Sequence, residues 1–383
     1  MIRYLILTPF FPSKESFRGS YILDQVKAIQ TNSEFKITVI ILSSFFNKTP
    51  SNYEIEGVQC ISFKLFDFPS FILPGFFHSL NSIRFKSFLV AHSIKVKSNT
   101  IVHGHINYPS SLFLSYLFKK YNCKTILQHH GLDVLQFKTG TKLIKFFKKW
   151  QNKIISKRFI ASQKDIVWSV GVSDKVVENI RQFDVKKSSK YITLYNGVDT
   201  NKFFPITKDN NLQDKLFHIG CIANFWKSKG QLTLLKSIQL LQQKGLDIQL
   251  HFVGSGSHLN ECKRFVEDNN LTNCIFNEMI PHNELNSFYN TLDLFVLPST
   301  DEALGCVYLE AWAINLPFIG IENQGIEELI PKDLRQRQLS KADNHIDLSE
   351  KIMFYYENRR QEVFNQDLDI NNTIKRFLKT IND

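Results

Sequence analysis

The sequence lacks the features of membrane-spanning and disulfide-bonded proteins. Among its 383 residues no apolar run reaches the ~20 residues that a transmembrane helix needs, so we expect no such helix. Pro9 and Pro12 interrupt the apolar start and no cleavage site follows, so we expect no signal peptide. The six cysteines are scattered, without CxxC or metal-ligand spacing. They suit a reducing cytosol and predict neither a disulfide framework nor a metal site.

Acidic residues are scarce in the first half of the chain. Residues 1–200 carry 28 Lys and Arg against 12 Asp and Glu, whereas residues 201–383 carry 19 against 24. The net charge of +11 therefore belongs to the first half. A basic half-molecule indicates an anionic partner: a membrane face, a phosphorylated acceptor or nucleic acid.

The stretch from Asp293 to Ala311 predicts a strand, a turn of small residues and a helix. An apolar run up to Leu297 is typical of a strand buried on both faces, and Gly305 lies in the loop before the helix. The first N–H groups of such a helix, and the positive end of its dipole, can receive phosphate.

Two carboxylates, Glu302 and Glu310, bracket this turn. Eight residues at helical rise span ~12 Å, roughly the distance from a sugar to a ribose across a diphosphate. One carboxylate could therefore accept hydroxyls of a sugar and the other those of a ribose. An ordinary pair of surface glutamates around a strand–helix loop would show the same pattern.

The first half alternates predicted strands and helices. Strands are expected at Ile2–Thr8 and Lys36–Leu42, with an amphipathic helix at Tyr21–Thr31 between them. Gly19 lies just before that helix, where backbone can approach a ligand closely. A plain loop at a helix start explains the same residues.

Histidines follow two further predicted strands, Thr100–His105 and Thr125–Gln128. The carboxyl ends of parallel strands face the ligand crevice, which makes His130 a candidate site residue and makes His105 and Asp133 candidates for acceptor binding. Histidine there can donate to a sugar hydroxyl or transfer a proton near neutral pH. A zinc site would need a carboxylate or thiolate partner, and neither is suitably spaced.

Two segments of the first half have an unusual composition. Phe63 to Val90 holds eight phenylalanines, predicts no regular structure, and suits a helical lid, an apolar acceptor surface or core packing. Thr141 to Ile160 carries seven Lys and Arg and no acid. A basic amphipathic helix with aromatics can lie in an anionic lipid interface. A helix packed on the sheet with solvated lysines is the alternative.

A second α/β series follows the polar linker Ile206–Asp214. We therefore expect an N-terminal domain at 1–205, a C-terminal domain at 206–365, and a C-terminal helix within 366–383 that packs back on the first domain. The expected elements of this series are His218–Ala223, Gln231–Lys244, Asp247–Val253, a helix ending near Asn269, Cys274–Phe276, Asp293–Leu297, Pro317–Ile321 and Ile370–Ile381.

The order of several short motifs resembles glycosyltransferase family 4, retaining enzymes of the GT-B fold. The motifs run through most of the chain and are densest between Asn196 and Glu328. Each is weak alone, but their order and spacing together are highly specific. They are His130-Gly-x-Asp133, Asn196-Gly-Val-Asp199 with the following Phe204-Pro205, Lys229-Gly230, Val253-Gly-x-Gly256, Leu297-Pro-Ser299, the E-x7-E segment Glu302–Glu310, and Gly325-Ile-Glu-Glu328.

The resemblance implies an α/β fold of two Rossmann-like, doubly wound domains facing a central cleft. It implies that Lys229 neutralises the donor diphosphate. It also implies that Glu302 binds hydroxyls of the transferred sugar and Glu310 those of the ribose. His130 would contact the sugar near the reacting carbon, and Gly19 would line the cleft from the first domain. Backbone N–H groups would hold the same phosphates, and these belong to Leu304, Gly305, Cys306 and Val307.

One departure from the family concerns the loop before Lys229. The family often has an arginine there, whereas this chain has Asn224-Phe-Trp-Lys227 and no arginine. Lys227 can supply the charge for donor binding but not the bidentate fork of a guanidinium. The family is metal-independent, so we expect neither a metal nor another cofactor.

The sequence therefore predicts a retaining glycosyltransferase that moves a sugar from a nucleotide-sugar to a hydroxyl acceptor, a lipid-linked or cell-surface glycan precursor. We expect a cytoplasmic protein at the inner face of an anionic membrane. Two alternatives stay open: another GT-B activity such as a nucleotide-sugar epimerase, and a non-catalytic GT-B subunit that binds nucleotide or glycan. Nucleic-acid binding would explain the basic half but leave the C-terminal motifs unused, so no nucleic-acid partner is expected.

Overall fold

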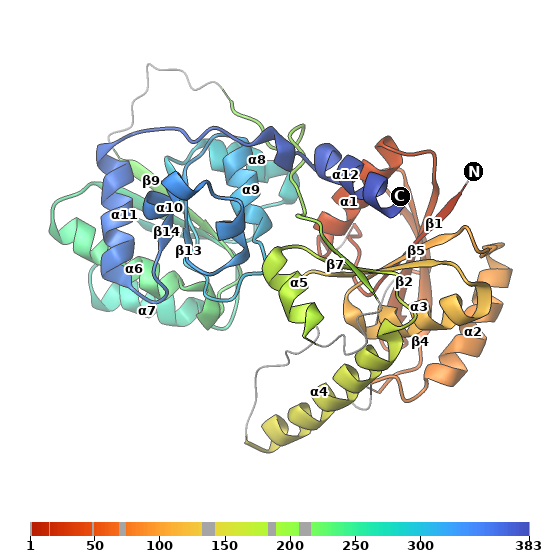
Figure 1. The fold of residues 1–383 in the computed structure, drawn as a ribbon. Coiled ribbons are helices and arrows are strands. Elements are labelled where there is room, and N and C mark those ends of the chain that lie inside the picture. Colours follow the sequence, from red (N-terminus) through yellow and green to blue (C-terminus); the bar gives the residue numbers. More distant parts are fainter. Residues whose placement is uncertain are drawn as a thin grey trace. The chain divides into compact units, whose positions relative to one another are not determined.

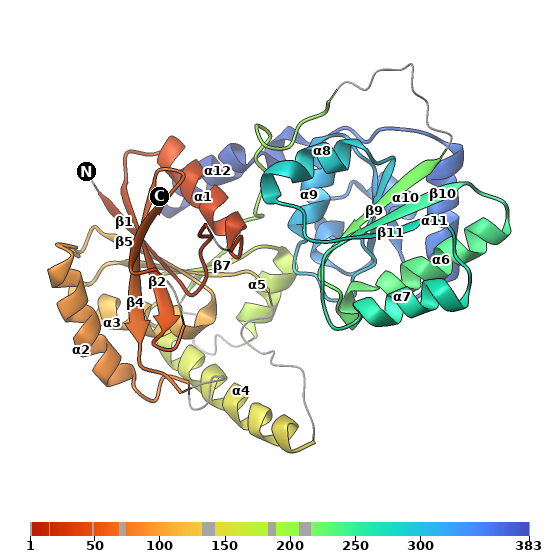
Figure 2. The ribbon, with the colours of Figure 1, turned by 180° about the vertical axis from the view of Figure 1, so that it is seen from behind.

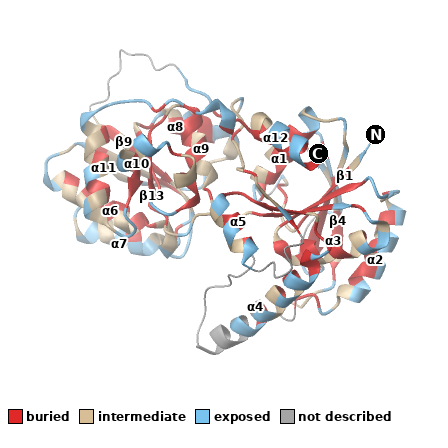
Figure 3. Ribbon diagram, viewed as in Figure 1, coloured by how far each residue is buried: buried red, intermediate tan, exposed pale blue. Residues whose placement is uncertain are grey.

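The chain divides into two compact units (Figure 1). Unit 1 comprises residues 1–196 and 373–383, and unit 2 comprises residues 197–372. The computed structural model describes residues 2–14, 16–47, 50–68, 74–131, 142–182, 189–206 and 216–382, apart from the side chains of residues 142–148 and 152. Each unit has its own sheet and its own core, which lies mainly in the strands (Figure 3).

The sheet of unit 1 is parallel except at one edge. Its strand order is β3-β4-β2-β1-β5-β6-β7-β8, and β3 runs antiparallel to β4. The central strands are continuous apolar runs, such as Leu5–Leu7 and Val39–Leu42, whose residues are at most 2% exposed because helices cover both faces. The strands are β1 (Arg3–Thr8), β2 (Lys36–Ser44), β3 (Asn52–Ile55), β4 (Val58–Leu65), β5 (Ile101–His105), β6 (Lys124–His129), β7 (Trp168–Gly171) and β8 (Lys190–Thr193).

Helices lie on both faces of this sheet. One face carries α1 and α12, and the other carries α2, α3 and α4 (Figures 1 and 2). The last helix starts in unit 2 and ends in unit 1, where the ring of Phe377 lies 5.8 Å from that of His103. The helices are α1 (Ser20–Thr31), α2 (His78–Ala91), α3 (Asn107–Tyr121), α4 (Lys142–Gln163), α5 (Asp174–Arg181) and α12 (Ile370–Asn382).

The sheet of unit 2 is parallel throughout its described strands. Its order is β11-β10-β9-β12-β13-β14, so the chain first winds outward in one direction from β9 and then in the other from β12. This reversal creates a crevice at the carboxyl ends of β9 and β12, the place where such sheets bind ligands. The strands are β9 (Phe217–Ile222), β10 (Ile248–Val253), β11 (Cys274–Asn277), β12 (Leu294–Val296), β13 (Phe318–Ile321) and β14 (Leu339–Ser340).

Short helices and turns connect these strands. Helices α6 and α7 lie together along one face of the sheet (Figure 2). The helices of unit 2 are α6 (Gln231–Gln243), α7 (Leu259–Asp268), α8 (Leu285–Asn290), α9 (Cys306–Ala313), α10 (Lys332–Gln338) and α11 (His345–Glu357), and short 3-10 turns precede α6 at Lys227–Lys229 and follow β13 at Gly325–Glu328.

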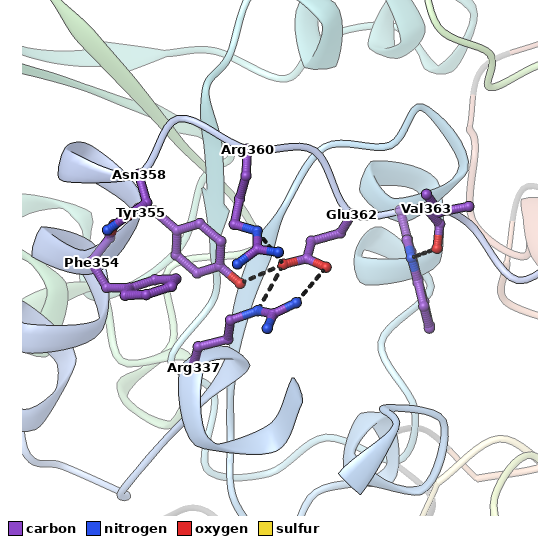
Figure 4. A network of polar contacts seen from close by, with 8 residues as sticks. Arg337, Phe354, Tyr355, Asn358, Arg360, Glu362 and Val363 are labelled. Atoms are coloured by element: carbon purple, nitrogen blue, oxygen red, sulfur yellow. Dashed lines mark hydrogen bonds and ion pairs between the residues drawn. The ribbon is translucent and has the colours of Figure 1, made fainter. Parts of the chain in front are cut away.

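A buried carboxylate holds the segment that follows α11 (Figure 4). Glu362 is 4% exposed and accepts two hydrogen bonds from Arg337, at 2.9 and 3.0 Å, and one from the Tyr355 hydroxyl at 3.2 Å. The indole of Trp312 donates to the backbone oxygen of Val363 at 2.9 Å. These contacts fix the chain to unit 2 before it reaches α12.

The structure confirms the α/β class with two Rossmann-like units, and most expected elements lie within two residues of their predicted bounds. The prediction that Phe63 to Val90 is irregular is wrong, because this stretch contains the end of β4 and the whole of α2. The basic segment forms α4. In the described part of that helix Ile155 and Phe159 are buried, while Lys149, Lys153 and Lys157 are exposed. None of the described helices is long and apolar enough to cross a membrane.

Candidate active site

The candidate site of unit 2 lies in the loops that follow β9 and β12. The loop after β9 leads through the turn Lys227–Lys229 to α6, and the loop after β12 leads to α9. The backbone N–H of Thr300 donates to the oxygen of Ser228 at 2.8 Å, which joins the two loops directly. The crevice at the reversal of the sheet is therefore bounded by these two loops.

Two glycines, one after β9 and one after β13, let the backbone approach the loop after β12 closely. Gly230 has φ +72°, and a Cβ there would lie 2.2 Å from the backbone oxygen of Pro298. A Cβ on Gly325 would lie 1.7 Å from the backbone oxygen of Ala303. Any larger residue at either position would separate the backbones that shape the crevice.

Lys229 and Glu302 form an ion pair across the crevice. The Lys229 Nζ lies 2.5 Å from Glu302 Oε2, and the two side chains are 23% and 16% exposed. The backbone of Glu302 is also fixed, since its N–H donates to Gln324 Oε1 at 3.0 Å and its oxygen accepts from the Gly325 N–H at 3.3 Å. The site therefore presents a cation and a carboxylate that solvent still reaches.

The start of α9 lies beside this pair. The Cγ of Glu302 is 3.1 Å from the position that a Cβ on Gly305 would take, and Gly305 is the N-cap of α9. Leu304 is 1% exposed, whereas Cys306 and Val307 are partly exposed at the first turn of the helix. The positive end of the helix dipole thus adds to the charge of Lys229 at a place suited to phosphate.

Glu310 lies one turn further along α9 and is held by a tyrosine. The Tyr289 hydroxyl, from α8, donates to Glu310 Oε2 at 2.8 Å and lies 3.3 Å from the backbone oxygen of Val307. Tyr289 is fully buried, and burial together with Glu310 raises its pKa well above the usual value. The hydroxyl therefore stays protonated and fixes one oxygen of the carboxylate.

The ~12 Å expected between Glu302 and Glu310 needs a correction. That distance assumed helical rise over all eight residues, but the helix starts only at Cys306. The first part of the interval is loop, so helical rise does not give the separation of the two carboxylates.

Unit 1 brings its own candidate residues together at the ends of β5 and β6. His105 Nδ1 lies 2.8 Å from His130 Nε2, and their rings stack with centroids 5.1 Å apart. The ring of Tyr21, two residues after Gly19, lies 4.7 Å from that of His130. Gly19 is the N-cap of α1. The start of α1 and the ends of two strands therefore converge around His130.

Burial keeps the inner histidines of this group neutral. His103 and His105 are fully buried and stack on each other with centroids 4.4 Å apart. Burial, together with the neighbouring imidazoles, lowers the pKa of His103 to about 3 and lowers that of His105 well below its usual value. His130 is partly exposed and is thus the candidate that a substrate can contact, whereas His105 is buried.

The remaining predicted residues are placed as follows. Lys227 is exposed and lines a cavity of about 210 Å³ with His258, whereas Lys229 contacts Glu302. Asp133 lies outside the described residues. A larger cavity of about 510 Å³ is lined by residues at the amino-terminal ends of strands, such as Phe217 and Pro317, and also by Tyr289.

Two residues that hold the site were not predicted from the sequence. Tyr289 holds Glu310, and Gln324 holds the backbone of Glu302. Gln324 directly precedes the quoted Gly325 motif, so that motif gave a local signal for it. Tyr289 lies in a short helix before β12 and offers no such signal.

Comparison with known families covers nearly the whole chain. A model described as Glycosyltransferase Family 4 matches residues 21–202, and one described as Glycosyl transferases group 1 matches residues 203–373. Two Rossmann-like units matched in this order make the chain a glycosyltransferase of the GT-B class. Within that class it belongs to the family 4 type.

Curated relatives match only part of the chain. A GDP-mannose-dependent alpha-(1-6)-phosphatidylinositol monomannoside mannosyltransferase of Mycolicibacterium smegmatis is 28% identical over 148 residues, which cover 35% of this chain and 39% of the relative. The capsular polysaccharide biosynthesis glycosyltransferase CapM of Staphylococcus aureus is 26% identical over 192 residues, which cover 46% and 48%. The chain thus spans less than half the length of these relatives.

Solved structures share the fold over the full length. HepE of Anabaena, determined in complex with UDP and glucose, has a TM-score of 0.67 and 14% identity, with 100% of this chain and 97% of that chain covered. At this identity the likeness concerns the fold alone.

Proposed function

We propose that the protein is a retaining glycosyltransferase that transfers a sugar from a nucleotide-sugar to a hydroxyl acceptor. The observation that carries this proposal is the Lys229–Glu302 pair at the reversal of the sheet in unit 2, beside the start of α9. A diphosphate needs a cation and N–H donors, and a sugar needs a carboxylate that accepts hydroxyls. This crevice offers all of these within a few residues.

Donor binding would exchange partners within the ion pair. In the structure Lys229 and Glu302 neutralise each other. The donor diphosphate would take the Lys229 ammonium and the N–H groups from Leu304 to Val307, and the released Glu302 carboxylate would accept hydroxyls of the transferred sugar. The exchange leaves no buried charge without a partner, because each group gains a ligand atom as it loses the other.

Ribose recognition would fall to Glu310. The hydrogen bond from the Tyr289 hydroxyl to Glu310 Oε2 would hold the carboxylate in place for the ribose hydroxyls. The name of the GDP-mannose-dependent relative supports a nucleoside diphosphate sugar as the class of donor.

In the transfer itself the bond between the anomeric carbon and the diphosphate oxygen breaks, and a bond from the acceptor oxygen to the same carbon forms. The acceptor proton passes to the departing diphosphate, which leaves as a nucleoside diphosphate. Lys229 and the α9 dipole would stabilise the charge that develops on this leaving group. They would take the role that a divalent ion has elsewhere, so the reaction would need no metal.

The acceptor would be a lipid-linked or cell-surface glycan precursor at the inner face of a membrane. The names of the relatives support this class, since one acts on a phosphatidylinositol monomannoside and another in capsular polysaccharide biosynthesis. The excess of Lys and Arg over residues 1–200 supports an anionic surface nearby.

The test is a panel of nucleotide-sugars incubated with and without candidate glycan acceptors. The proposal predicts that one donor releases its nucleoside diphosphate in an acceptor-dependent manner, with the anomeric configuration preserved in the product. Conversion of the donor to an isomer without acceptor would indicate an epimerase. Tight donor binding without any conversion, across a broad acceptor panel, would indicate a non-catalytic subunit.

A further inference from the structure

One region of unit 1 exposes more apolar surface than the active-site proposal explains. Helix α2 and the loops next to it carry large apolar side chains that solvent reaches, and together we name them the α2 patch. Its members are Phe45 (55% exposed), Phe46 (68%), Phe66 (38%), Phe76 (61%), Leu80 (46%), Ile83 (68%) and Val90 (72%).

Three loop members of the α2 patch contact one another and, through an arginine, helix α2. The rings of Phe45 and Phe46 lie 6.0 Å apart, and those of Phe45 and Phe66 stack at 5.5 Å. The guanidinium of Arg84 lies 4.1 Å from the centroid of Phe66, which joins the loops to α2. Arg84 follows Ile83 on the helix. The rings of Phe45, Phe46 and Phe66 therefore adjoin α2 at Arg84, beside the exposed Ile83.

Helix α2 is apolar on both of its sides. Its inner residues Phe85 and Leu89 are at most 2% exposed and pack toward the sheet, where Phe85 contacts Phe63 and Phe113 at centroid distances of 5.0 and 4.7 Å. Its outer residues Leu80, Ile83 and Val90 repeat at helical spacing and remain exposed. Figure 3 shows α2 at the outside of unit 1 with exposed residues along it. The same exposed side also carries Ser79, Lys86 and Ser87, so it mixes apolar and polar side chains, as a helix that lies at a lipid interface does.

The charges around the α2 patch favour an anionic bilayer over an apolar protein surface. No Asp or Glu occurs between Asp67 and Asp133. Asp67 itself accepts a hydrogen bond from the Tyr108 hydroxyl. The charged residues near the patch members in the sequence include the cations Lys64, Arg84 and Lys86 and this one acid. Lipid headgroups would meet the cations while the aromatic and aliphatic side chains enter the acyl boundary. A second copy of the chain would instead bring the same cations together.

We propose that the α2 patch inserts into the interface of an anionic lipid bilayer and so brings unit 1 to its acceptor. This inference rests on the proposed acceptor class, because an acceptor at a membrane is what the insertion would serve. The α2 patch and the basic helix α4 would act differently: α4 would attract anionic headgroups by charge, whereas the α2 patch would insert apolar side chains. Side chains of this size reach ~5–10 Å into the headgroup and acyl boundary when a helix lies in the interface.

The test compares two matched triple variants of the full chain by flotation with vesicles of neutral lipid alone or with added phosphatidylglycerol. The patch variant is Phe46→Ser, Ile83→Ser and Val90→Ser. The control variant is Met279→Ser, Ile346→Ser and Val363→Ser, which removes three side chains of unit 2 that are 57 to 84% exposed. Wild type and control should float with the anionic vesicles, and the patch variant should partition at least about tenfold less.

Three results would overturn the inference. Wild type could fail to float with either kind of vesicle. The patch variant could float as well as wild type. Wild type could also prove dimeric in sedimentation and the patch variant monomeric without any change in flotation, which would make a second copy the occupant. Binding of a nucleoside diphosphate should be equal in all three proteins. If flotation fails while that binding persists, only this inference falls. If no nucleotide binds at all, the proposed function fails independently.

Discussion

The substitution Tyr289→Phe removes a single hydroxyl from the candidate site. In the structure that hydroxyl donates to Glu310 Oε2 at 2.8 Å, and the Tyr289 ring packs between Phe203 and Phe295 at 6.0 and 5.7 Å. Phenylalanine keeps these ring contacts. The change therefore isolates the hydrogen bond to the carboxylate.

The size of the effect follows from the burial of the pair. Tyr289 is fully buried, so water does not replace the lost donor, and a hydrogen bond to a charged group contributes ~1.5–3 kcal/mol. We expect the free energy of unfolding to fall by about 1–3 kcal/mol. We expect the Kd for the best nucleoside diphosphate to rise about tenfold, because the ribose must then order a carboxylate that Tyr289 no longer holds. A tenfold rise in Kd corresponds to a loss of about 1.4 kcal/mol in binding free energy.

Calorimetric titration with a ribonucleoside diphosphate and its 2′-deoxy analogue measures the effect at its source. Wild type should prefer the ribose form, and Tyr289→Phe should reduce that preference. Tyr355→Phe is the matched control, because it also removes a hydroxyl bonded to a buried carboxylate, Glu362, at 3.2 Å but away from the crevice. It should lower stability and leave both Kd values unchanged. An unchanged ribose preference in Tyr289→Phe would refute the role of this hydroxyl.

Three further predictions concern the metal, the pH and the membrane. Activity should survive EDTA, because Lys229 and the start of α9 stabilise the diphosphate; loss on chelation that magnesium or manganese restores would contradict this. Burial lowers the pKa of His103 to about 3, so on acidification the unfolded chain binds a proton at this histidine at a higher pH than the folded chain does. The contribution of His103 to the free energy of unfolding should therefore be fully present above pH 6.5 and fall as the pH drops toward 3. Urea unfolding should show a loss of about 2 kcal/mol at pH 5 from His103 alone, and equal stability at pH 7.5 and 5 would count against a buried neutral imidazole. The exposed lysines of α4 are Lys149, Lys153 and Lys157. Replacing them with Gln should weaken binding to anionic vesicles by ~1 kcal/mol for each lysine and reduce the salt dependence of that binding. Unchanged binding would exclude α4 as the membrane contact.

The fold could be predicted from the sequence where local pattern and tertiary environment agree. A strand such as β12 is a short apolar run closed by Pro298, and a parallel sheet buries both of its faces, so the pattern leaves little choice. Glycine and lysine before α6 likewise marked a loop at a helix start. The order of these units along the chain was enough for the class of fold.

Helix α2 shows where periodicity fails. A helix is recognised by a polar face that alternates with an apolar one, but α2 has apolar residues on both sides and buries the polar Asn81 and Ser82. Asn81 bonds the backbone of Phe66 through both its oxygen and its nitrogen, at 3.0 and 2.8 Å. A polar residue that turns inward to hold a neighbouring loop reverses the pattern, so the segment was predicted to be irregular.

The site was predictable in its charged residues and not in the groups that hold them. Lys229 and Glu302 come from loops 73 residues apart, and only the parallel pairing of β9 with β12 brings these loops together. Tyr289 meets Glu310, and His105 meets His130, through side-chain packing that no sequence spacing encodes. Contacts of this kind depend on tertiary structure, which local propensity does not specify.

The most direct test of the account is the rate of sugar transfer by Lys229→Ala at saturating donor, beside Lys236→Ala as the control. Lys236 lies on α6 and lines the smaller cavity, so its loss should leave the rate near that of wild type. Lys229 pairs with Glu302 and would carry the diphosphate charge. The account predicts that its loss lowers turnover by ~10²–10³, the scale of one preorganised electrostatic contact. A turnover close to wild type in Lys229→Ala would contradict the assignment of the donor site.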